Sequence, residues 1–100
     1  MTWATKAIES LKKGDQITLT PHGNSMKPLI HDGDKVTIIP MKDEPRPSDI
    51  VLCKIRGKEY LHIVKAVSGN RYLIGNNRGN TNGWIGINSI YGRVIKVEPK

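Results

Sequence analysis

The sequence has one cysteine, Cys53, and no phenylalanine among its 100 residues. A single cysteine excludes an internal disulfide and any metal site built from several thiolates, and its apolar neighbours predict that it is a small buried residue. No window approaches the 18 apolar residues of a membrane span, and the first 14 residues lack the apolar stretch of a signal peptide. We therefore expect a soluble, cytoplasmic chain with no membrane span and no metal or other cofactor.

Acidic residues are also scarce, because 9 Asp and Glu stand against 16 Lys and Arg, which gives a net charge of +7. Such an excess would suit an anionic partner if the basic residues were gathered into a patch. They are scattered instead, the densest cluster being Lys12 and Lys13, and no aromatic residues alternate with them. This distribution favours a solvated surface and argues against nucleic acid as a partner.

Helical periodicity is confined to the start of the chain. Residues 3–13 place four apolar side chains on one face of a helix, namely Trp3, Ala7, Ile8 and Leu11. Thr2 is suited to cap this helix and Gly14 to end it. We expect one short N-terminal helix packed on a sheet.

Short strands separated by turns account for most of the chain after Gly14. Ten Gly and six Pro interrupt the sequence about once every six residues. Alternating or β-branched stretches predict strands at 16–20, 35–39, 49–55, 59–67, 71–74 and 90–97, and residues 75–89 are expected to form an ordered polar loop. The sequence therefore predicts one mainly β domain over residues 1–100, with a helix at 3–13 and a small antiparallel, barrel-like sheet over 15–98.

The most informative segment is Gly23-Asn24-Ser25-Met26-Lys27-Pro28-Leu29-Ile30. Gly23 allows backbone conformations that other residues resist, and Pro28 is suited to begin a helical turn whose amides face the serine. Backbone donors around a serine hydroxyl are what an oxyanion requires. Turn formation alone would also explain a serine here.

This segment and the adjoining Asp-Gly-Asp-Lys-Val resemble the nucleophile region of the S24/S26-type serine peptidases, which include LexA-like repressors and signal peptidases. Three later blocks extend the resemblance over residues 16–97 in the family's order: 47–51, where Ser48 stands at the usual glycine, 60–67, and 75–82 with 92–94. The resemblance implies a LexA-like or signal peptidase-like fold with Ser25 as the nucleophile. It also implies that Gly23, Asn24 and Met26 form the substrate and oxyanion region.

The general base that the resemblance implies is His62 or Lys65. Aligning Tyr60-Leu61 with the family's residues before its base places His62 at the base position, where bacterial enzymes carry lysine and eukaryotic-type signal peptidases carry histidine. Side chains alternate across a strand, so without a bulge only one of the two faces Ser25. Histidine is neutral near pH 7 unaided, whereas lysine needs deep burial, so we favour His62 and keep Lys65 as the alternative.

The eukaryotic-type enzymes place an aspartate in the fourth block, but residues 76–84 contain no carboxylate. Asn82 is the nearest substitute there. Its carbonyl oxygen can orient an imidazole but stabilises the imidazolium less than a carboxylate does. We therefore expect slow turnover if the chain is an enzyme.

Two functions remain compatible with these residues. The first is a serine peptidase that cleaves an extended peptide in another protein, and the second is a non-catalytic regulatory or protein-binding module that kept the fold. LexA-type self-cleavage uses an Ala-Gly bond, which this sequence lacks, and about 14 residues before the first strand are too few for a DNA-binding domain. A homodimer is compatible with either function.

Overall fold

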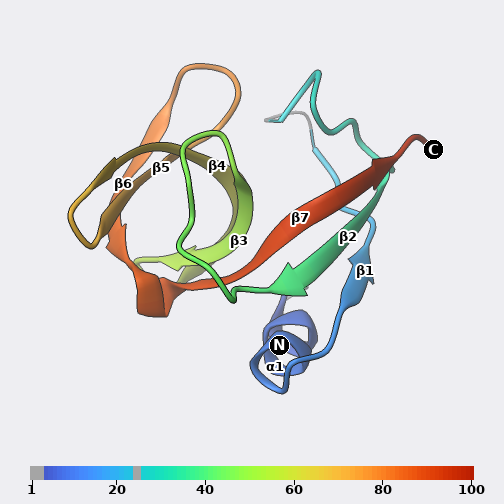
Figure 1. The fold of residues 1–100 in the computed structure, drawn as a ribbon. Coiled ribbons are helices and arrows are strands. Elements are labelled where there is room, and N and C mark those ends of the chain that lie inside the picture. The colour runs from blue at the N-terminus through green and yellow to red at the C-terminus, as the bar shows by residue number, and fades with distance from the viewer. Residues whose placement is uncertain (1–3, 24–25) are drawn as a thin grey trace.

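A computed structural model describes residues 4–23 and 26–100 and contains one helix followed by a run of strands (Figure 1). The helix α1 spans Thr5–Lys12, and a 3-10 turn, η1, spans Ile87–Ser89. The strands are β1 (Ile17–Leu19), β2 (Lys35–Pro40), β3 (Ile50–Ile55), β4 (Lys58–Ser68), β5 (Arg71–Gly75), β6 (Thr81–Gly86) and β7 (Ile90–Glu98).

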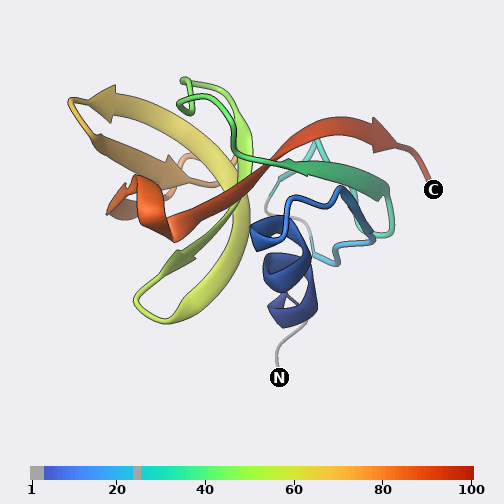
Figure 2. The same ribbon diagram turned by 60° about the horizontal axis from the view of Figure 1, so that its bottom comes forward.

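All the strands belong to one sheet in the order β1-β2-β7-β3-β4-β5-β6, and every neighbouring pair is antiparallel. The half formed by β3 to β6 curls round on itself, whereas β2 and β7 extend away from it toward the side where α1 lies (Figures 1 and 2). This curled half-barrel with one short helix confirms the predicted mainly β, antiparallel, barrel-like fold.

The strands β3 and β4 lie between two hydrophobic cores. Val51 and Cys53 face the core inside the curled half, and Leu52 faces the core under α1. All three are fully buried. Strand residues point alternately to opposite faces, so a continuous apolar run is stable only where both faces are covered. The same alternation on β4 places His62 and its cross-strand partner Val51 on the inner face of the curled half.

The helix is shorter than predicted at both ends. Ala4 is its N-cap and makes no side-chain cap hydrogen bond, and Thr2, which was expected to cap the helix, lies outside the described residues. Trp3 lies outside the described residues. The apolar face is as expected, because Ala7, Ile8 and Leu11 are buried. In the described part of the chain no helix is long and apolar enough to cross a membrane.

The predicted loop at 75–89 is wrong over most of its length, because it contains β6 and η1. This stretch has five Asn and four Gly, both of which are depleted in strands, so its composition favours a loop. The backbone hydrogen bonds to β5 stabilise β6 as a strand instead. Ile85 pairs with Tyr72 and is buried with it in the inner core.

Ser48 has a φ of 78°, in the left-handed region that favours glycine. It stands just before β3, and its N–H donates to the carbonyl of Val64 over 2.8 Å. The Val64 N–H in turn donates to the carbonyl of Asp49, also over 2.8 Å. The start of the β3–β4 ladder therefore holds a non-glycine residue in a conformation that costs it free energy.

Replacing Ser48 by glycine should raise the free energy of unfolding by about 0.5–1 kcal/mol, because glycine adopts this φ without steric cost. Ser48→Ala is the matched control and should give no gain, since alanine meets the same steric cost. Urea unfolding followed by circular dichroism measures both. Equal stability of the glycine and alanine variants would contradict the explanation.

Candidate active site

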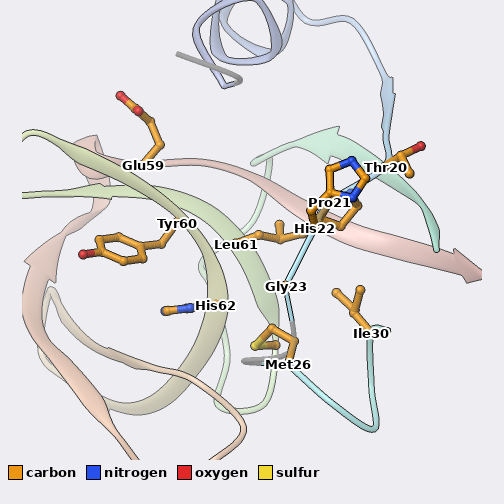
Figure 3. Close-up of a pocket in the computed structure, with 10 residues that line it drawn as sticks. All are labelled: Thr20, Pro21, His22, Gly23, Met26, Ile30, Glu59, Tyr60, Leu61 and His62. Carbon is orange, nitrogen blue, oxygen red and sulfur yellow. The ribbon is translucent and has the colours of Figure 1, made fainter. Parts of the chain in front are cut away.

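A cavity of about 330 Å³ opens between two segments that are far apart in the sequence. One is 20–23, together with Met26 and Ile30, and the other is 59–62 on β4. Four of the lining side chains are apolar: Pro21, Met26, Ile30 and Leu61. Tyr60 and His62 point to one side of β4 and Leu61 to the other (Figure 3). The segment that precedes Ser25 and the strand that carries His62 thus share one cavity.

Asn24 and Ser25 lie outside the described residues, so the structure is described only on either side of them. Gly23 has a φ of 111°, which glycine accepts readily. After Ser25, Met26 is buried, and the Ile30 N–H donates to its carbonyl over 2.9 Å. Residues 26–29 therefore form a single hydrogen-bonded turn that contains a cis Lys27–Pro28 bond. Pro28, which was expected to begin a helical turn, lies inside this one, which starts at Met26.

His62 is held by the amide of Asn82. The imidazole Nδ1 lies 2.9 Å from Asn82 Oδ1, and the His62 residue is 8% exposed. An amide oxygen only accepts hydrogen bonds, so Nδ1 carries the proton that it donates. In the neutral imidazole the lone pair is then on Nε2. The structure thus joins two of the residues that the sequence singled out.

A β-bulge gives Asn82 its place beside His62. Thr81 pairs with Gly75 and Gly83 pairs with Ile74, so Asn82 is an extra residue in β6 at this point of the ladder. A bulge redirects side chains locally, and bulges are common beside active sites. It turns the amide of an edge-strand residue toward the curled interior, where His62 lies.

The pKa of His62 is lowered from its usual value of 6.5. Burial is the main cause, because it disfavours the charged imidazolium, and the hydrogen bond to Asn82 opposes it in part. The Tyr60 ring, whose centroid is 5.0 Å from that of the imidazole, covers part of the group. At neutral pH the imidazole is therefore uncharged, which is the state that a general base requires.

Lys65, the alternative base, lies elsewhere. It is exposed, and a bulge in β4 makes it the extra residue, because Val64 pairs with Ile74 and Ala66 pairs with Leu73. Its aliphatic carbons run beside Gly75, where an added methyl group would be 3.1 Å from Lys65 Cε. Gly75 pairs with Ile63, whose side chain belongs to the core under α1. Val64 belongs to the other core, inside the curled half. Lys65 therefore lies at the surface, whereas His62 is buried.

Two polar residues beside the Ser25 segment were not found from the sequence. Gly23 N–H donates to Asp32 Oδ1 over 2.7 Å, and Asn77 Nδ2 donates to the carbonyl of Lys27 over 2.8 Å. The Gly23 N–H is the main cause of a lowered pKa for Asp32, so this group is a carboxylate at neutral pH. Both residues lie in stretches whose composition is typical of turns. Neither stretch carries a signal of the long-range contact.

Two further side chains, those of His22 and Cys53, are of a chemical type that can take part in catalysis. His22 lines the cavity but is exposed, with Nδ1 3.4 Å from Asp32 Oδ1. Cys53 is fully buried as predicted, and burial raises the pKa of its thiol to about 12. Thiols react as thiolates, so Cys53 is not a competing nucleophile.

The fold thus brings together a buried histidine, an amide that accepts from it, and a cavity lined by Gly23 and Met26. The sequence model described as Peptidase S24-like matches residues 2–95 of this chain. The chain belongs to the Peptidase S24-like family. A comparison with curated proteins finds no significant match. The match to the Peptidase S24-like model covers nearly the whole chain and confirms the S24-type, LexA-like resemblance.

The titration of His62 tests the geometry directly. Its midpoint, followed by NMR of the imidazole carbons, should lie below 6.5 because the group is buried. Asn82→Ala should lower the midpoint further, since it removes an acceptor that stabilises the imidazolium. Asn82→Asp should raise it, because a carboxylate stabilises that charge more strongly.

Asn88→Ala is the control for these variants, because Asn88 is an exposed residue of η1. It should leave the His62 midpoint unchanged. Equal midpoints in the wild type and in both Asn82 variants would mean that the Asn82 contact does not govern His62.

Proposed function

We propose that this Peptidase S24-like chain is a serine peptidase in which Ser25 is the nucleophile, His62 the general base and Asn82 the residue that orients the imidazole. The observation that carries the proposal is the His62–Asn82 pair at a cavity also lined by Gly23 and Met26, which flank residues 24 and 25. Donation from Nδ1 places the lone pair of the neutral imidazole on Nε2, the atom that takes the proton in the proposed reaction. The family match supplies the reaction class.

In the proposed reaction, His62 Nε2 takes the Ser25 hydroxyl proton while Oγ forms a bond to the peptide carbonyl carbon. The C–N bond then breaks, and the leaving amine receives that proton from Nε2. Water, activated by the same imidazole, hydrolyses the serine ester and regenerates the hydroxyl. Asn82 accepts from Nδ1–H throughout and keeps the ring in the tautomer that these steps need.

The proposed substrate is an extended peptide segment of another protein. The cavity lies between residues 20–23 and residues 59–62 of β4. A substrate peptide bound in it would run alongside the extended backbone of β4. Extended peptides bind such sites through main-chain hydrogen bonds and place alternate side chains in pockets. The apolar lining by Pro21, Met26, Ile30 and Leu61 favours an apolar side chain in this one.

A second function, a non-catalytic binding module, is favoured by one observation. The acceptor at His62 Nδ1 is an uncharged amide, which stabilises the imidazolium of the transition state less than a carboxylate does. The tautomer is nevertheless the productive one. We therefore propose a slow enzyme, and the binding module becomes the conclusion if Ser25 proves unreactive.

Labelling with a fluorophosphonate probe decides between the two. The wild type should become covalently labelled at Ser25, as located by peptide mass spectrometry. Ser25→Ala should abolish labelling, and His62→Ala should slow it by about 10²-fold or more, because a positioned base contributes ~10²–10⁴-fold. Lys65→Met should react like the wild type.

Two results would contradict the assignment. Loss of labelling in Lys65→Met with reactivity retained in His62→Ala would make lysine the base. An unlabelled wild type at every pH tested, from acid to alkaline, would replace the enzyme by the binding module.

The pH dependence of labelling should follow the neutral fraction of His62. The rate should rise as pH increases through a midpoint below 6.5 and should be level above it, because burial lowers the pKa of this imidazole. A rate still rising well into the alkaline range would instead indicate a lysine base.

Asn82→Asp should move this midpoint upward and raise the level rate by about 10-fold, since an adjacent carboxylate shifts a pKa by ~1–3 units in favour of the imidazolium. Asn88→Ala is again the control. An Asn82→Asp variant that is slower at its plateau would show that charge at Nδ1 does not limit the reaction.

A further inference from the structure

The segment from Gly23 to Lys27 is held at both ends by side chains from other parts of the fold. At its start, Gly23 N–H donates to Asp32 Oδ1 over 2.7 Å. At its end, Asn77 Nδ2 donates to the carbonyl of Lys27 over 2.8 Å. Asp32 lies nine residues after Gly23, and Asn77 lies fifty after Lys27, so neither contact is a local turn hydrogen bond.

The turn that carries Asp32 is itself fixed. His31 N–H donates to Asp34 Oδ2 over 2.8 Å, and Asp34, which is 5% exposed, also accepts from Lys100 N–H over 3.2 Å. Gly33 N–H donates to the carbonyl of Pro21 over 3.1 Å. Two hydrogen bonds in opposite directions therefore join this turn to residues 21–23, and Asp32 supplies the charged one.

The loop that carries Asn77 is fixed in a similar way. Asn76 Oδ1 accepts from the N–H groups of Arg78 and Asn80 over 2.8 and 3.2 Å, and Asn76 N–H donates to the carbonyl of Asn80 over 3.0 Å. Asn82, two residues after Asn80, accepts a hydrogen bond from His62 Nδ1. One short stretch of chain therefore contacts both the Lys27 carbonyl and the imidazole.

We propose that Asp32 and Asn77 are positioning residues, which fix the two ends of the Gly23–Lys27 segment and thereby set the distance and direction of Ser25 relative to His62. This inference rests on the proposed function. Only three residues separate the two anchored positions, so a shift at either end is passed to the serine. Displacements of about 1 Å at a reacting group reduce rates by ~10²-fold. Both anchors lie at the surface, so their removal should affect reactivity more than folding.

The rate of fluorophosphonate labelling at Ser25, measured on the alkaline plateau, tests the proposal. Asp32→Ala and Asn77→Ala should each slow labelling by at least about 10-fold, given the ~10²-fold cost of a 1 Å displacement. The pH midpoint should stay at its wild-type value, because His62 and Asn82 are untouched. Asp32→Asn keeps an acceptor oxygen and should recover most of the rate. Asn77→Asp has no N–H to donate and should not recover it.

Asp43→Ala and Asn88→Ala are the matched controls, because both residues are exposed and belong to the 41–49 loop and to η1. They should label like the wild type. A thermal melt of each variant measures stability alongside. A rate loss that tracks the melting temperature across all variants, controls included, would overturn the positioning role.

Amide NMR gives a readout that does not require activity. Asp32→Ala should shift the Gly23 amide resonance and speed its hydrogen exchange, and both alanine variants should shift the Ser25 and Met26 amides, whereas the controls should not. Shifts at Gly23 with normal labelling would overturn the positioning role and leave the peptidase standing. If the wild type is not labelled, the proposed function fails. The Ser25 and Met26 amides then decide the positioning claim: movement supports it and none overturns it.

Discussion

The whole structure depends on covering both faces of the β3–β4 pair. Val51, Leu52 and Cys53 are consecutive and fully buried, so their side chains enter two different cores. Burial of each Val or Leu side chain contributes roughly 1.5–3 kcal/mol, which a small domain cannot forgo. The chain has one helix in its described part to cover a face. The sheet therefore supplies the second cover by curling β5 and β6 back over β3 and β4 (Figure 1).

This curling has a direct effect on the site. It places the edge strand β6 opposite the inner face of β4, so that Asn82 meets His62 although twenty residues separate them. The histidine side of the site is consequently part of a packed sheet. The proposed nucleophile belongs instead to a segment outside the sheet, with hydrogen bonds at Gly23 and Lys27 on either side of it. Hydrophobic packing of the sheet therefore holds His62 in place, whereas a few polar contacts hold Gly23 and Lys27.

Most strands could be predicted to within a residue or two, because β-branched runs between turn residues mark them plainly. The exception is β6, where Asn82, Gly83 and Gly86 interrupt the strand pattern and pairing with β5 stabilises the strand. The resemblance pointed to His62 and Asn82 as neighbours, but not to the bulge that brings the amide inward. Asp32 and Asn77 were out of reach for another reason. Their hydrogen bonds join loops across the fold, and no local pattern records such a contact.

Cys53 gives the chain a property unrelated to the proposed peptidase site. Its side chain faces the core inside the curled half of the sheet and is fully buried there. A thiol reagent reaches it only when this core opens, and no other cysteine in the sequence competes for the reagent. The rate of alkylation under native conditions therefore measures how often this core opens. The measurement needs no engineered cysteine.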